Sequence, residues 1–315
     1  ATAPAAPAGG DPAGEAARHA PCSTLLTSLW RDELSNPARA RVDQVSGVTE
    51  PSDLLFVDGL LYTVSDSFRD IYRLSFDGPG GSVRRSEAWS IAGLPVGVDL
   101  EAMGRLPSGE VLLASETNGA IFVLSPFPRH ACAAWRTEVD GGCFIGRSNC
   151  GIEALAVLPD GRLLVAKERD PRGAWLFDLP AAPCAGTTLT GRTYLKLPDE
   201  VGPDISAATY DPLSDHILLV ARSRQRVLEF EVPPRTPGDT SPRALQLVGS
   251  FSFAAAENTL DYPGLDFHQV EGIAVDADRV LYLVVDNNER ISRAFGNRRP
   301  ALLRFFPVED RACPR

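Results

Sequence analysis

Acidic side chains recur at a fixed place in a repeated sequence pattern. Each copy of the pattern has an apolar run, a short turn and a second apolar run. The first run begins with Glu101, Glu153 or Glu271 in three copies, and with Ser52 or Ser206 in the other two. If the fold brings the equivalent positions of these copies together, their carboxylates cannot all stay charged and unpaired, because the costs of desolvation and of mutual repulsion are too high. A bound cation, shared protons or basic partners must offset that cost.

The end of the second apolar run supplies a second set of charged side chains: Asp66, Glu116, Glu168, Arg222 and Asp286, with Lys167, Arg169 and Asn287 beside them. Hard carboxylate oxygens favour Ca²⁺ or Mg²⁺ over softer metals. With four histidines in the chain, a histidine-rich transition-metal site is not expected. We therefore predict a Ca²⁺ site, with Mg²⁺ as the alternative, whose ligands come from Glu101, Glu153, Glu271, Asp286 and Asn287.

Such a site suggests a metal-dependent hydrolase as the first functional hypothesis. The cation would polarise a phosphoryl or carbonyl oxygen and could orient a water molecule. Lys167, Arg169 and Arg222 would hold an anionic small-molecule substrate by charge-assisted hydrogen bonds. The candidates for the general base are Glu116, Glu168 and His268.

A binding module is the second hypothesis. In that case the loops would hold a sugar, a peptide or another envelope protein, and any ion would be structural. The scarcity of histidine and the lack of a G-x-S-x-G motif favour this interpretation. A repeated glutamate could also simply bond to the backbone of a neighbouring repeat. A lactonase or a sugar-oxidising enzyme is a third option that no residue selects.

The elements that must position these residues are short strands. The five copies span residues 52–66, 101–116, 153–168, 206–222 and 271–286, and each is followed by a third apolar run and often a fourth. Repeats of about 40–50 residues with four short strands are typical of β-propeller blades. A β-sandwich also has many short strands, but it does not predict a fixed period. We expect an all-β propeller with five blades.

Ring closure and the shared face follow from this architecture. The run at residues 24–30 could be the outer strand of the last blade, so that both ends of the chain share one blade. Six blades are the alternative, since residues 22–45 and 252–270 are unassigned. Because the first two strands of a blade are antiparallel, the start of one and the end of the next lie on one face. Both sets of charged residues should therefore meet at one mouth of the central channel.

Composition and cysteines bear on location and partners. Residues 1–21 are rich in Ala, Pro and Gly and predict a flexible leader that follows a removed secretion signal, with a single propeller domain at 22–315. Six cysteines suit an oxidising compartment, so we expect a secreted or periplasmic monomer. The net charge of −10 argues against nucleic-acid binding, and no apolar run is long enough for a membrane span. Of the 15 possible pairings, the expected disulfides are Cys22–Cys313, Cys143–Cys150 and Cys132–Cys184, and the alternative is that some of the cysteines are free buried thiols.

The repeats resemble a known family. DLEAMGRLPSGEVLLASE, GIEALAVLPDGRLLVAKERD and VEGIAVDADRVLYLVVDNNE are similar to the repeats of phytase-like propellers, whose family label refers to esterase-like activity of phytase. The pattern also resembles the SdiA-regulated secreted propellers of bacteria. The resemblance covers roughly residues 46–308 and implies a secreted or periplasmic propeller that is a calcium-dependent hydrolase of phosphate esters or other esters. Ser52 and Ser206 depart from the glutamate pattern.

Overall fold

Almost all of the strands belong to four-stranded antiparallel units. The computed structural model describes Trp30 and residues 40–77, 83–117, 119–137, 151–168, 172–236, 238–253, 269–286 and 300–307. The first unit contains β2 (Pro51–Val57), β3 (Leu60–Ser65), β4 (Asp70–Phe76) and β5 (Val83–Ser90). The second contains β6 (Leu100–Arg105), β7 (Val111–Ser115), β8 (Ala120–Leu124) and β9 (Ala131–Arg136).

The other units repeat this order. The third contains β10 (Ile152–Val157), β11 (Arg162–Lys167), β12 (Gly173–Asp178) and β13 (Thr190–Lys196). The fourth contains β14 (Ile205–Asp211), β15 (His216–Ala221), β16 (Arg226–Glu231) and β18 (Leu247–Ser252). The fifth contains β19 (Val270–Val275), β20 (Leu281–Val285), β21 (Ala301–Phe305) and β1 (Ala40–Ser46). Short connecting elements are β17 (Arg243–Ala244), η3 (Pro183–Ala185), η4 (Asp199–Val201) and η5 (Arg222–Arg224).

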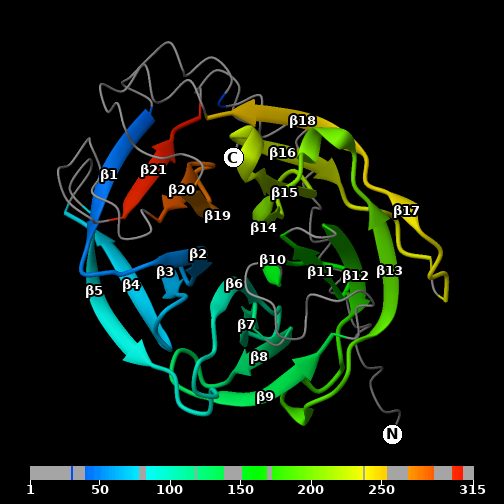
Figure 1. Cartoon of the computed structure of the whole chain (residues 1–315), viewed down its shortest axis with the longest axis horizontal. Coiled ribbons are helices and arrows are strands. Elements are labelled where there is room, and N and C mark those ends of the chain that lie inside the picture. Colours follow the sequence, from blue (N-terminus) through cyan, green and yellow to red (C-terminus); the bar gives the residue numbers. More distant parts are fainter. Residues whose placement is uncertain are drawn as a thin grey trace, which may run out of the picture.

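The units form a ring around a central axis. The first strand of each unit is innermost, and these strands contact one another in the cyclic order β2, β6, β10, β14, β19 and back to β2 (Figure 1). The fourth strands lie at the periphery. The prediction of an all-β propeller is confirmed. The described residues form five such units, while the blade number of the whole chain stays a prediction.

Apolar packing between neighbouring units forms the core. Each of five buried clusters joins strands of two adjacent units, as where Leu112 and Ile121 of the second unit meet Leu163 and Trp175 of the third. Both faces of the second and third strands are therefore covered. This explains why their sequences are continuous apolar runs rather than an alternation of apolar and polar residues.

The ring closes through a different segment from the one predicted. The outer strand of the last unit is β1, which pairs with β21 and also meets β5 of the first unit in parallel. Residues 24–29, for which this position was predicted, lie outside the described residues, and β1 occupies the position next to β21. The ends of the ring do share one unit, as predicted. The sequence did not reveal this strand because β1 contains polar and charged residues. Its Asp43 is nevertheless buried, and the cost of burying this charge is offset by Arg304, whose Nε and Nη2 donate to the Asp43 carboxylate at 2.9 and 2.5 Å.

One predicted disulfide is confirmed. Cys132 and Cys184 are bonded, with Cα atoms 5.3 Å apart, and they join β9 of the second unit to η3 of the third. The other two predicted pairs, Cys22–Cys313 and Cys143–Cys150, lie outside the described residues. In the described part of the chain, no helix has the length and apolar character needed to cross a membrane.

Asp53 ties three inner strands together. Its buried carboxylate, on β2, accepts hydrogen bonds from the backbone N–H groups of Leu54 (2.7 Å), Met103 on β6 (2.6 Å) and Ile273 on β19 (3.4 Å). The backbones of β2 and β19 lie close together here, as shown by Gly272: a Cβ atom at this position would lie 2.6 Å from the Cα of Asp53. The bonding between neighbouring blades that was considered for the repeated glutamates is thus performed by an aspartate beside the serine of the first repeat.

We expect Asp53→Asn to lower the free energy of unfolding by about 2–4 kcal/mol, because an NH₂ group would then face a buried backbone N–H. Chemical denaturation measures this change. Asp58→Asn is the control, because that side chain is 76% exposed and its ion pair with Arg105 lies at the surface. The control should change stability by less than about 0.5 kcal/mol. Equal effects of the two changes would contradict the assigned role of Asp53.

Candidate functional site

A β-bulge begins every inner strand. The pairing of each inner strand with its second strand skips one residue near the start, and the skipped residues are Ser52, Glu101, Glu153, Ser206 and Glu271. A bulge leaves the extra residue out of the ladder and re-aims its side chain. Four of these five residues, all except Ser206, line a cavity at the centre of the ring. The local backbone thus turns the repeated glutamates toward the axis.

The residues that follow the second strands are anchored beside these bulges. The backbone N–H groups of Asp66, Glu116, Glu168 and Asp286 each donate to the carbonyl oxygen of a residue just before the inner strand of the same unit, at 3.2, 3.0, 3.2 and 2.9 Å. The start of the first strand and the end of the second therefore lie together, as predicted from their antiparallel pairing.

The central cavity is strongly acidic. Its volume is about 490 Å³, and its described lining has nine carboxylates and one arginine, together with Pro51, Ser52 and Gln269. The charged residues are Asp66, Asp99, Glu101, Glu116, Glu153, Glu168, Asp204, Glu271, Asp286 and Arg222.

Most of the predicted site residues meet in this cavity. Lys167 does not line it and is buried in β11, with 1% of its surface exposed. Arg169, His268 and Asn287 lie outside the described residues. The sequence placed Asp66, Asp99 and Asp204 beside the strand ends at this mouth, but the prediction gave them no role as ligands or bases. Asp99 and Asp204 each stand two positions before a bulge residue.

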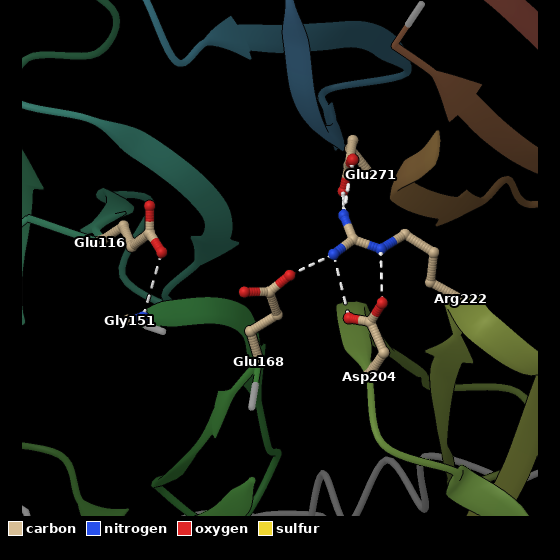
Figure 2. Close-up of polar contacts among 6 residues, drawn as sticks. All are labelled: Glu116, Gly151, Glu168, Asp204, Arg222 and Glu271. Carbon is tan, nitrogen blue, oxygen red and sulfur yellow. Dashed lines mark hydrogen bonds and ion pairs between the residues drawn. The ribbon is translucent and has the colours of Figure 1, made fainter. Parts of the chain in front are cut away.

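Arg222 neutralises one side of the cavity. Its Nη1 donates to both carboxylate oxygens of Glu271 at 2.6 Å, and its Nε and Nη2 donate to Asp204 at 3.2 and 3.0 Å. Nη2 also donates to Oε1 of Glu168 (Figure 2). Burial lowers the pKa of Arg222, but Glu271 and Asp204 more than offset this, so the pKa is raised. One guanidinium thus joins carboxylates from the third, fourth and fifth units.

A buried carboxylate cluster lies beside this network. Oxygens of Glu116, Glu153 and Glu168 lie within 4.8 Å of one another. Glu116 accepts a hydrogen bond from the N–H of Gly151 at 3.2 Å, on the far side of Glu168 from Arg222 (Figure 2). A Cβ atom at position 151 would lie 2.3 Å from the Cγ of Glu116, so the glycine makes room for this side chain. A second cluster, with partly exposed members, contains Asp66, Asp99 and Glu101.

Burial and mutual repulsion make these carboxyl groups hard to ionise. Burial raises the pKa of Glu153 well above its usual value, and Glu168 and Glu271 raise it further, while Arg222 opposes the shift. The pKa of Glu101 is also raised by burial, with a contribution from Glu153. Burial raises the pKa of Asp66 to about 7, as it does that of Glu271, where Arg222 limits the rise.

Glu153 is the member of the buried cluster with the least compensation. Its surface is 6% exposed, and in the described part of the chain its carboxylate has no hydrogen-bond or ion-pair partner. A buried carboxylate in this state is costly unless it is protonated or meets a cation.

Solved structures share the fold at low sequence identity. A luciferin-regenerating enzyme superposes with a TM-score of 0.51 at 10% identity, over 86% of this chain and 96% of that one. The glutaminyl cyclase of Myxococcus xanthus has a TM-score of 0.45 at 15% identity, over 86% and 97% of the two chains. The virginiamycin B lyase of Staphylococcus aureus has a TM-score of 0.42 at 9% identity, over 84% and 98%.

The family is identified from the sequence. No curated protein matches the chain. The family model named Phytase-like, with the description "Esterase-like activity of phytase", matches residues 45–289, a range that includes all the inner strands and every described residue of the cavity lining. By this match the chain belongs to the Phytase-like family of propellers, as the resemblance of its repeats implied.

Proposed function

We propose that the central cavity binds a divalent cation, Ca²⁺ or Mg²⁺, and that the protein is a cation-dependent hydrolase of phosphate esters or other esters. The observation that carries this proposal is the buried carboxylate of Glu153, which lacks a partner among the described residues in a cavity with nine carboxylates and one arginine. The family supports the esterase-like class of reaction.

The donor set fits a hard cation. All the candidate ligands are carboxylate oxygens, which are the ligands that Ca²⁺ and Mg²⁺ prefer. The residues that would hold the cation come from the two clusters: Asp66, Asp99 and Glu101, and Glu116, Glu153 and Glu168. A bound divalent cation would supply Lewis-acid polarisation of a phosphoryl or carbonyl oxygen.

A carboxylate of the cavity would act as the general base that takes a proton from the attacking water. Glu116 is held by the N–H of Gly151 and lies in the buried cluster, where a carboxylate oxygen that does not hold the cation would accept a proton from an attacking water. Glu168 is the alternative base, although one of its oxygens is engaged by Arg222. The roles predicted for Arg169, His268 and Asn287 stay predictions, because these residues lie outside the described ranges. Lys167 is buried and does not line the cavity, so it is not part of the proposed substrate site.

The setting of the reaction follows from the same features. The Cys132–Cys184 bond supports an oxidising compartment, so the proposed location is outside the cytoplasm. The proposal keeps two further predictions from the sequence, a monomer and an anionic small-molecule substrate. A non-enzymatic scaffold with a structural ion is the second candidate. It is favoured by the way in which Arg222 links three units.

Metal content and thermal stability test the cation. Purified protein should contain stoichiometric Ca²⁺ or Mg²⁺, and EDTA should lower the melting temperature because the cavity carboxylates then repel one another. Glu153→Gln should weaken cation binding and remove most of the EDTA effect. Glu231→Gln, at an exposed position on β16, is the control and should behave as the wild type. Absence of metal together with no effect of EDTA would contradict the proposed cation.

An assay of ester hydrolysis distinguishes the enzyme hypothesis from the scaffold hypothesis. p-Nitrophenyl phosphate and p-nitrophenyl acetate serve as probes at a temperature where the EDTA-treated protein is still folded. A catalytic cation predicts turnover that EDTA abolishes and Ca²⁺ restores. A melting temperature that depends on the cation, with no turnover of either class of ester, would favour the scaffold.

The raised pKa values predict an unusual pH dependence. A carboxyl whose pKa is higher in the folded state stabilises the fold most at low pH, and this stability is lost as the pH rises through the folded pKa. In EDTA the melting temperature should therefore fall as the pH rises from about 5 to about 8, since Asp66 and Glu271 titrate at about 7. Asp66→Asn should flatten the profile. A melting temperature that rises over this range would contradict the assignment.

A further inference from the structure

We propose that Arg222 acts as a built-in cation for one half of the carboxylate ring, and that the metal ion binds in the other half, at Glu116, Glu153 and Glu168. This inference rests on the proposed cation and specifies its place. It assigns Glu271 to the arginine rather than to the metal, and it makes Arg222 a positioning residue rather than a substrate-binding one.

The contacts of Arg222 account for one set of carboxylates. Each of its three side-chain nitrogens donates to a carboxylate, and Glu271 is bound through both of its oxygens. A metal ion on Glu271 or Asp204 would have to displace this buried guanidinium, which is enclosed with 8% of the residue's surface exposed. Two cations side by side would also repel each other.

Charge in the fourth unit is reversed relative to the others. The residue after the second strand is acidic in the other four units, at Asp66, Glu116, Glu168 and Asp286, but it is Arg222 in the fourth unit. The bulge residue of that unit is Ser206 instead of a glutamate. The chain thus supplies a positive charge from the same position where its other units supply negative ones.

Glu168 connects the two halves. One of its oxygens binds Arg222, while the other points away from the arginine, toward the side where Glu116 lies (Figure 2). Arg222 thereby holds Glu168 in the orientation that places it with Glu116 and Glu153. The independent sign of a ligand at this cluster is Glu153, which is more than nine-tenths buried and has no partner among the described residues.

Two matched substitutions test the assignment. Glu153→Gln and Glu271→Gln change the same residue type at the same bulge position of two inner strands, and each removes one negative charge from the cavity. Calcium binding by isothermal titration calorimetry should weaken by about 100-fold or more in Glu153→Gln, which loses a ligand. It should weaken by less than about tenfold in Glu271→Gln, which changes only a neighbouring charge already paired with Arg222.

Substitution of Arg222 gives a second, independent readout. Arg222→Gln should bind one Ca²⁺ more than the wild type, because Asp204 and Glu271 lose their counter-charge, and its melting temperature should depend more strongly on Ca²⁺. Arg222→Lys retains the charge and should keep the wild-type stoichiometry. A merely structural role for Arg222 predicts a loss of stability that Ca²⁺ does not restore.

The outcomes separate this inference from the proposed function. Equal loss of Ca²⁺ binding in Glu153→Gln and Glu271→Gln would overturn the inference while leaving the cation in place. Unchanged stoichiometry in a folded Arg222→Gln protein would also overturn it. If Arg222→Gln fails to fold, the comparison of the two glutamate variants decides. A wild type that binds no Ca²⁺ or Mg²⁺ would contradict the proposed function itself.

Discussion

Repulsion among buried carboxylates at the axis is the constraint on which the site depends. The propeller brings nine carboxylates, some buried and some partly exposed, to the lining of one cavity, and the single arginine of the described lining can satisfy only its immediate neighbours. Arg222 does so for Glu168, Asp204 and Glu271. Glu153 has no such partner among the described residues, and its raised pKa expresses the cost of ionising a buried carboxyl beside other carboxylates.

The fold tolerates this electrostatic repulsion because its stability comes from apolar packing and strand pairing away from the axis. Five apolar clusters fill the contacts between neighbouring units, and β1 closes the ring by pairing with β21. The bulges and the anchoring backbone bonds then aim the charged side chains at the axis without interrupting that packing. A scaffold with this degree of support can keep an unfavourable charge arrangement, which the proposed cation would relieve.

The architecture and most of the site could be predicted from the sequence, because both depend on a repeated local pattern. The same strand–turn–strand period that marks the units also sets the glutamates and the second-strand ends in register, so Glu101, Glu153 and Glu271 could be placed at one mouth. Contacts between distant residues that compensate buried charges leave no such pattern in the sequence. β1 was not recognised as a strand because its buried Asp43 is paired with the distant Arg304, and the three backbone N–H groups that donate to Asp53 come from three strands. The division of the ring by Arg222 depends on which carboxylates lie nearest in space, which the order of residues does not reveal.

The proposed cation and its location can be tested most directly by anomalous diffraction from crystals grown with Ca²⁺ and, separately, with Tb³⁺ as a heavier substitute. The account predicts a strong anomalous peak enclosed by the carboxylates of Glu116, Glu153 and Glu168, with the guanidinium of Arg222 still bound to Glu271. A peak coordinated by Glu271 and Asp286, with Arg222 displaced, would contradict it. So would the absence of any peak in the central cavity from crystals saturated with either ion.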